Sequence, residues 1–143
     1  MIETESGLSR WTEDDYRSEA SREISTFFVA KDSESRSLTG FIIVRLITTP
    51  RTLPDESTVP FEAEILNIGV LASFRHRGIG RALLDEVLSQ LRSLGRGTIH
   101  LEVRARNRSA IRFYDRFGFE ITGFRPAFYR EPADDAVLMT LHV

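Results

Sequence analysis

The feature that most constrains the fold of this chain is a short glycine turn, Arg75-His76-Arg77-Gly78-Ile79-Gly80, followed directly by an amphipathic stretch. Apolar residues recur there at helical spacing and predict a helix from Arg81 to Leu94. Its apolar stripe consists of Ile79, Leu83, Leu84, Val87, Leu88, Leu91 and Leu94. The segment before the turn, Ile65 to Leu71, predicts a buried strand. A strand, a glycine turn and a helix N-terminus in this order can hold a phosphate on backbone amides.

The spacing of the glycines weighs against two common nucleotide loops. A P-loop ends in Gly-Lys-Ser/Thr, whereas the only lysine of the chain is Lys31. A dinucleotide-binding loop needs a third glycine where this chain has Leu83. The pattern that remains is R-x-x-G-x-G, and taken alone it fits a structural turn as well as a ligand loop.

Composition limits the alternatives further. The 143 residues predict one domain covering 1–143. The absence of cysteine excludes disulfides, zinc-thiolate sites and a cysteine nucleophile. His76, His100 and His142 lack the spacing of metal ligands, so we expect no metal. The polar, acidic N-terminus has no signal peptide, and Arg45 interrupts the strongest apolar run, which predicts a cytoplasmic chain without a membrane partner.

Charge is distributed unevenly along the chain. Residues 75–130 carry 12 arginines and 5 acidic residues, whereas residues 1–74 carry 7 basic and 13 acidic residues, within a net charge of -2. The basic segment contains the glycine turn, as expected for a polyanionic ligand, although solvated arginines explain it equally. Aromatic residues do not interleave the arginines in the way that a stacking platform for bases would need, so we expect no nucleic acid partner.

The rest of the chain alternates between predicted strands and helices. Thr12 is an N-cap candidate for a helix through Ser21, and Thr48 to Pro60 predicts a long loop, either a lid near the site or a disordered decoration. The other predicted elements are strands at 26–31, 40–47, 98–103, 119–124 and 136–143 and a helix at 107–117, with Asn107 as N-cap and Gly118 as the C-terminal glycine.

The strand at 98–103 contains the candidate chemistry. Ile99, Leu101 and Val103 alternate toward one face, which places His100 and Glu102 together on the other. The Glu102 carboxylate can face a cleft, or it can simply pair with a nearby arginine.

On the following predicted helix, Asn107 and Tyr114 are two turns apart and therefore share one face. Tyr114 can also be a core aromatic whose hydroxyl finds a partner. The spacing alone does not decide between these interpretations.

Several ordered motifs from Phe61 to Val143 resemble the GNAT superfamily of acyl-CoA-dependent N-acyltransferases, in particular its RimI-type ribosomal-protein alanine N-acetyltransferases. The R-x-x-G-x-G loop is the pyrophosphate loop of this superfamily. The other matching segments are Asn67-Ile68-Gly69-Val70, Arg81-Ala82-Leu83-Leu84, Leu101-Glu102-Val103-Arg104 with Asn107, Ala110-Ile111, Phe113-Tyr114, Phe117-Gly118-Phe119, Tyr129, Asp135-Ala136 and Leu138-Met139.

The resemblance implies an α/β GNAT fold, a mixed and mostly antiparallel sheet splayed at its centre and flanked by helices. It implies acetyl-CoA as co-substrate and assigns residues to it. Backbone groups of Ile68, Gly69 and Val70 would face the pantetheine arm, His76, Arg77, Gly78, Ile79, Gly80 and Arg81 would hold the pyrophosphate, and Asn107 would contact the cofactor.

The same resemblance implies Glu102 as proton acceptor and Tyr114 as proton donor. An ammonium cannot attack a thioester, so a carboxylate must take its proton, directly or through a water. A tyrosine hydroxyl can protonate the departing thiolate, and an amide near Val70 can stabilise the oxyanion. Glu62 and Glu64, on the other strand bordering the expected cleft, remain alternative bases.

The resemblance is incomplete before Trp11. Family members begin with a strand and a complete helix before this position, whereas ten residues precede it here, and Ile2-Glu3 resembles the end of that helix. We therefore expect this chain to lack the first strand of the sheet and part of the first helix.

The sequence thus predicts an N-acetyltransferase that acts on a protein or peptide N-terminal α-amine, such as that of a ribosomal protein. The alternatives are acetylation of a small amine or a lysine, and a non-catalytic acyl-CoA-binding domain. The hairpin from Phe124 to Ala136 resembles the family element that covers the incoming peptide, and its aromatic residues Phe128 and Tyr129 could clamp that peptide or simply pack the turn.

Overall fold

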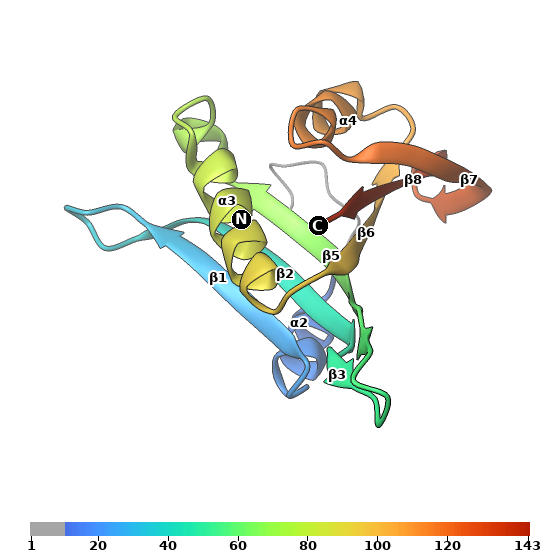
Figure 1. Ribbon diagram of the computed structural model, residues 1–143. Helices are drawn as coiled ribbons and strands as arrows, with labels where there is room; N and C mark the ends of the chain where they lie inside the picture. Colours follow the sequence, from blue (N-terminus) through green and yellow to red (C-terminus); the bar gives the residue numbers. More distant parts are fainter. Residues whose placement is uncertain (1–10) are drawn as a thin grey trace.

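The computed structural model describes residues 11–143, and the predictions for Ile2-Glu3 lie outside this range. Its main element is a six-stranded sheet with the strand order β1-β2-β5-β6-β8-β7 (Figure 1). The strands are β1 (Ser25–Lys31), β2 (Leu38–Thr48), β5 (Phe61–Val70), β6 (Gly97–Arg104), β7 (Glu120–Arg130) and β8 (Ala133–His142). Only β5 and β6 pair in parallel, and the other neighbours are antiparallel. The predicted mixed, mostly antiparallel sheet is confirmed.

Two helices cover one face of this sheet, and a third covers the other. Helices α3 (Ile79–Ser93) and α4 (Arg108–Asp115) pack on the face that contains the main core. Helix α2 (Glu13–Ala20) lies on the opposite face, over Phe41 and Ile43 (Figure 1). No helix within residues 11–143 has the length and apolar composition needed to cross a membrane.

Helix α3 confirms the predicted stripe except at its end. Leu83, Leu84, Val87, Leu88 and Leu91 are buried against the sheet. Leu94 follows the helix as its C-cap and is 40% exposed, so it does not belong to the buried stripe.

Local capping explains where the other helices begin. The Thr12 hydroxyl accepts from the Asp15 amide, and the Asp15 carboxylate accepts from the Thr12 amide, which forms a capping box. The Asn107 side chain accepts a hydrogen bond from the Ala110 amide at 3.1 Å and caps α4. Gly118 follows α4 at φ 89, a value that favours glycine.

The segment from Thr48 to Pro60 is neither of the two structures that we expected. It forms a small hairpin of β3 (Arg51–Thr52) and β4 (Thr58–Val59). The hairpin lies at the Phe61 end of β5, where the Glu62 amide donates to the Thr48 hydroxyl. Asp55 organises its turn by accepting from the Ser57 amide. A lid over the glycine turn, at the other end of β5, is therefore ruled out for this segment.

An irregularity in β5 redirects its side chains. Val44 of β2 pairs with Ile65, but the preceding residue, Ile43, pairs with Asn67, so Leu66 is an extra residue in the ladder. Such a β-bulge shifts the alternation of faces by one position. Ile65 and Ile68 consequently both pack against the main core, although an odd number of positions separates them.

Candidate active site

A cleft opens at the centre of the sheet where β5 and β6 separate. The two parallel strands pair only from Phe61 to Ile65 on β5 and from Gly97 to Leu101 on β6. Beyond these residues the strands diverge, as Figure 1 shows. The divergent ends, Ile65–Val70 and Glu102–Arg104, line a cleft of about 900 Å³ that α3 and α4 border. The cleft therefore results from the end of one strand ladder.

The glycine turn forms part of the wall of this cleft. Gly78 has φ 80 and is the N-cap of α3, a conformation that glycine adopts without strain. The Ala82 amide donates to the Gly78 carbonyl and closes the first helical turn. The first amides of a helix have no partner within it and carry partial positive charge. The predicted residues His76, Gly78, Ile79, Gly80 and Arg81 all line the cleft.

Gly80 keeps the space between α3 and α4 open. A Cβ atom at this position would lie 3.8 Å from Cζ of Phe113 and 3.8 Å from Cγ2 of Val70. Both neighbours line the cleft, so a side chain at Gly80 would enter the space between them. The role of Gly80 is thus different from that of Gly78, which is needed for its backbone angle.

Arginine side chains make the cleft basic. Its lining includes Arg75, Arg81, Arg104, Arg112 and Arg116. Arg77, a predicted cofactor residue, is exposed and does not belong to this lining. Its guanidinium lies over the Phe74 ring at 5.1 Å. The other predicted cofactor residues, Ile68, Gly69, Val70 and Asn107, do line the cleft.

Glu102 both lines the cleft and pairs with an arginine, the two arrangements that its sequence position allowed. The alternation of β6 is as predicted, with Ile99, Leu101 and Val103 buried in the core. Glu102 lines the cleft, and its Oε1 atom also lies 3.3 Å from Nη1 of Arg125 on β7. The carboxylate therefore faces the cleft while an arginine holds one of its oxygens.

Tyr114 lies in the part of the cleft wall that α4 contributes. It is 5% exposed, and its ring packs edge-on against Phe113 and Phe119. Burial raises the pKa of the Tyr114 hydroxyl well above its usual value, so this group stays protonated at neutral pH. Tyr114 and Asn107 both line the cleft, as their shared helix face predicted.

The alternative bases lie outside the cleft lining. Glu62 is exposed beside the small hairpin. Glu64 is partly buried at 3.9 Å from Arg45. Burial raises the pKa of Glu64, an effect that Arg45 opposes and Glu102 reinforces. Glu64 therefore lies close enough to Glu102 to interact with it.

Part of the cleft wall was not predicted from the sequence. Arg112 and Phe113 of α4 and Arg116, the C-cap of that helix, belong to the lining. None of them is three, four or seven positions from Asn107, so the helical spacing that relates Asn107 to Tyr114 does not indicate them. The contact of Arg125 with Glu102 was not predicted either, because the two residues are on different strands and no local pattern connects them.

Comparisons with known proteins agree with this geometry. A family model described as "Acetyltransferase (GNAT) family" matches residues 2–119. N-alpha-acetyltransferase RimI of Mycobacterium tuberculosis is 43% identical over 82 residues, which are 57% of this chain and 50% of that protein. [Ribosomal protein bS18]-alanine N-acetyltransferase of Escherichia coli is 37% identical over 84 residues, 57% of each chain. The matches thus span about half the length of these relatives.

A solved structure extends the likeness to nearly the whole chain. The crystal structure of Ard1 from Thermoplasma volcanium superimposes with a TM-score of 0.82 at 30% identity. The superposition covers 99% of this chain and 86% of that one. The similarity therefore includes the sheet, its central opening and the helices around it.

Proposed function

This chain belongs to the acetyltransferase (GNAT) family, and from that premise we propose that it transfers the acetyl group of acetyl-CoA to the N-terminal α-amine of a protein or peptide. One observation carries the proposal. Glu102 and Tyr114 line the same cleft, and so does the N-terminus of α3. A proton acceptor, a proton donor and an anion site thus share one space.

The cleft has the chemistry to hold a coenzyme A moiety. The amides at the start of α3 suit a pyrophosphate, and arginines add positive charge around it. The open space at Gly80 allows a ligand to approach the backbone closely. We assign Ile68, Gly69, Val70, Asn107 and the turn residues 76–81 to this ligand. Acetyl-CoA supplies an activated thioester to this site.

Two side chains would manage the protons. The Glu102 carboxylate takes a proton from the acceptor ammonium, directly or through a water, because only the neutral amine is a nucleophile. The buried Tyr114 hydroxyl is the proton donor for the departing thiolate; burial raises its pKa, which keeps the hydroxyl protonated before the transfer and also makes it a weaker acid. Neither role needs a covalent bond to the protein.

The α-amine is the acceptor that this site favours. An α-ammonium has a pKa of about 8 and a lysine ammonium about 10.4, so near neutral pH the α-amine has roughly a hundredfold larger neutral fraction. The single carboxylate of Glu102 then suffices to take the proton of the acceptor ammonium. The names of the relatives support the same class, since one is an N-alpha-acetyltransferase and another acts on a ribosomal-protein alanine.

Mass spectrometry of acetylated peptides tests the proposal. Peptides with a free alanine or serine N-terminus are compared with the same peptides blocked at the N-terminus but carrying a lysine. We expect acetylation of the free α-amines with release of CoA. Preferential acetylation of the blocked set would replace the α-amine with lysine as the acceptor. If acetyl-CoA binds but no amine stimulates CoA release, the chain is an acyl-CoA-binding domain.

A further inference from the structure

A continuous series of contacts connects Glu102 to the tip of the β7–β8 hairpin. Glu102 pairs with Arg125 at 3.3 Å, and the Arg125 guanidinium lies over the Phe128 ring at 5.6 Å. The Phe128 and Tyr129 rings meet edge-on with their centres 5.1 Å apart. Arg104 lies over the Tyr129 ring at 4.1 Å. These five residues form an arginine–aromatic chain that leaves β6 at Glu102 and returns to it at Arg104.

The strand register explains why this arginine–aromatic series of contacts both begins and ends on β6. Ala136 of β8 pairs with Arg104 on one side and with Arg125 on the other, so the two arginines flank the same small residue. The β7–β8 register then shifts between Arg125 and Tyr129, which gives β7 extra residues at the tip. This bulge brings Phe128 and Tyr129 back toward the two arginines.

Arg104 also attaches the tip of the hairpin to β6. Its Nη1 atom donates to the Pro132 carbonyl at 2.8 Å. The Ala127 amide donates to the Asp135 carboxylate at 2.7 Å, which holds the bulge in place. The tip that contains Phe128 and Tyr129 is therefore fixed relative to the cleft.

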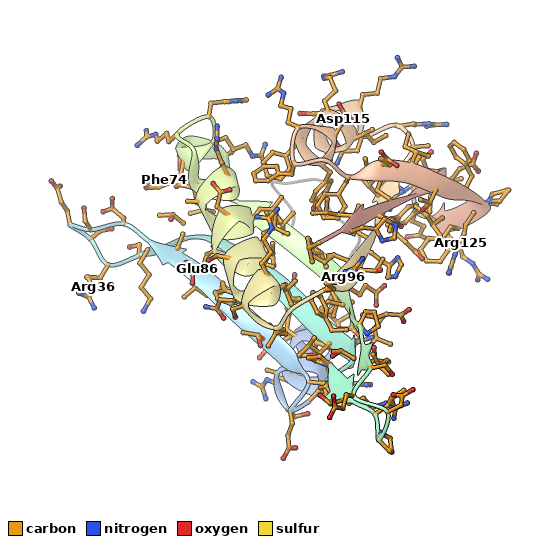
Figure 2. The ribbon with its side chains drawn as sticks, viewed as in Figure 1. Arg36, Phe74, Glu86, Arg96, Asp115 and Arg125 are labelled. Carbon is orange, nitrogen blue, oxygen red and sulfur yellow. The ribbon has the colours of Figure 1, made fainter. Side chains whose placement is uncertain are left out.

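Arg125 contacts Glu102 but does not itself line the cleft. Glu102, Tyr129 and Arg104 line the cleft, whereas Arg125 is absent from the lining that the described residues form. Figure 2 shows Arg125 on the β7–β8 hairpin, at the edge of the sheet. Its guanidinium contacts Oε1 of Glu102, which leaves Oε2 for a group in the cleft.

We propose that Arg125 is a positioning residue, which orients the Glu102 carboxylate toward the acceptor amine and is itself held by Phe128. This inference rests on the proposed transfer reaction. A carboxylate held at one oxygen loses rotational freedom, so its second oxygen stays aimed into the cleft. Because Phe128 and Tyr129 touch, the same contacts couple the orientation of the base to the aromatic wall beside it.

A double-mutant cycle tests this role. In the parent, Arg125→Ala should lower kcat about tenfold, the scale of one hydrogen bond to a charged group, with unchanged affinity for acetyl-CoA. In a Glu102→Gln background, the same change should lower kcat less than about twofold, because Arg125 acts through Glu102. A merely structural arginine would reduce kcat equally in both backgrounds.

Further variants distinguish orientation from folding. Arg125→Lys keeps a cation within reach of Glu102 and should restore part of the lost kcat, but the lysine lacks the planar guanidinium that lies over Phe128. Phe128→Ala should reproduce a smaller part of the loss. The matched controls are Ile121→Ala, exposed on β7 before the hairpin, and Arg92→Ala, exposed on α3, and both should leave kcat unchanged. Melting curves verify that every variant folds.

These measurements test the role of Arg125 separately from the proposed acetyl transfer. A parent protein with amine-dependent turnover and an unaffected Arg125→Ala variant would overturn the role of Arg125 alone, and so would equal losses in the two backgrounds. A parent without turnover on any amine would overturn the proposed function and this inference together.

Discussion

Gly80 of α3 faces Phe113 of α4 across the cleft, and a Cβ atom on Gly80 would lie 3.8 Å from the Phe113 ring. This distance is an ordinary van der Waals contact, so the helix tolerates a side chain there while the cleft loses space. Gly78 differs, because its φ of 80 would strain any substituted residue. Gly80 is therefore the better position for blocking the cleft without disturbing the fold.

We expect Gly80→Val to weaken CoA binding at least about tenfold, because the new methyl groups occupy the space beside the helix amides. Titration calorimetry measures the affinity, and a melting curve shows that the domain still folds. Ala82→Val, exposed on the same helix, is the control and should bind as the parent does. Equal affinity of the Gly80→Val protein would contradict the assignment of the turn.

Glu102→Gln and Tyr114→Phe should each lower turnover about 10²- to 10⁴-fold, the range for loss of one general acid or base. CoA affinity should change little, because both substitutions keep the shape of the side chain. In Tyr114→Phe the ring can retain its contacts with Phe113 and Phe119. Steady-state kinetics with a peptide acceptor provide the measurement. An unchanged rate in Glu102→Gln, with a loss in Glu64→Gln, would transfer the role of base to Glu64.

The pH profile should lack an alkaline fall caused by Tyr114. Burial disfavours the phenolate, which raises the pKa of Tyr114, so the protonated donor persists beyond the ordinary tyrosine range near 10. Turnover should rise as the acceptor α-amine loses its proton around pH 8 and then stay level to about pH 10. A decline near pH 10 in the parent that is missing in Tyr114→Phe would show that this hydroxyl titrates normally.

Glu19→Gln should destabilise the fold at pH 7 by roughly 3 kcal/mol, as expected when one partner of a buried ion pair is removed. Glu19 is 4% exposed on α2 and accepts from Arg45 of β2 at 2.8 Å. The Arg45 hydrogen bond lowers the pKa of Glu19 below that of the unfolded chain. Its stabilisation is therefore complete above the unfolded pKa and is lost as pH falls through the folded one.

Urea denaturation at pH 7 and at pH 3 measures this difference. The gap between parent and Glu19→Gln should narrow at the lower pH. Glu13→Gln is the control, because Glu13 pairs with Arg17 on the exposed side of the same helix, and its effect should stay below about 1 kcal/mol. Equal effects of the two substitutions would show that burial of Glu19 does not matter.

Residue patterns within single elements predicted much of the fold. The stripe of α3, the alternation of β6 and the caps Thr12 and Asn107 all agree with the structure. Such features depend on side chains a few positions apart, whose spacing is set by helix or strand geometry. The segment from Thr48 to Pro60 was not predicted correctly, because its small strands have only each other as partners.

The sequence by itself determined which residues carry the candidate chemistry, since Glu102, Tyr114 and the glycine turn stand out through local spacing and family resemblance. Only the tertiary structure decided how they meet. The cleft exists because β5 and β6 stop pairing after Ile65 and Leu101, and Arg125 from another strand contacts the Glu102 carboxylate. These relationships join residues more than 20 positions apart, and the packing of the whole sheet, not local periodicity, brings such residues together.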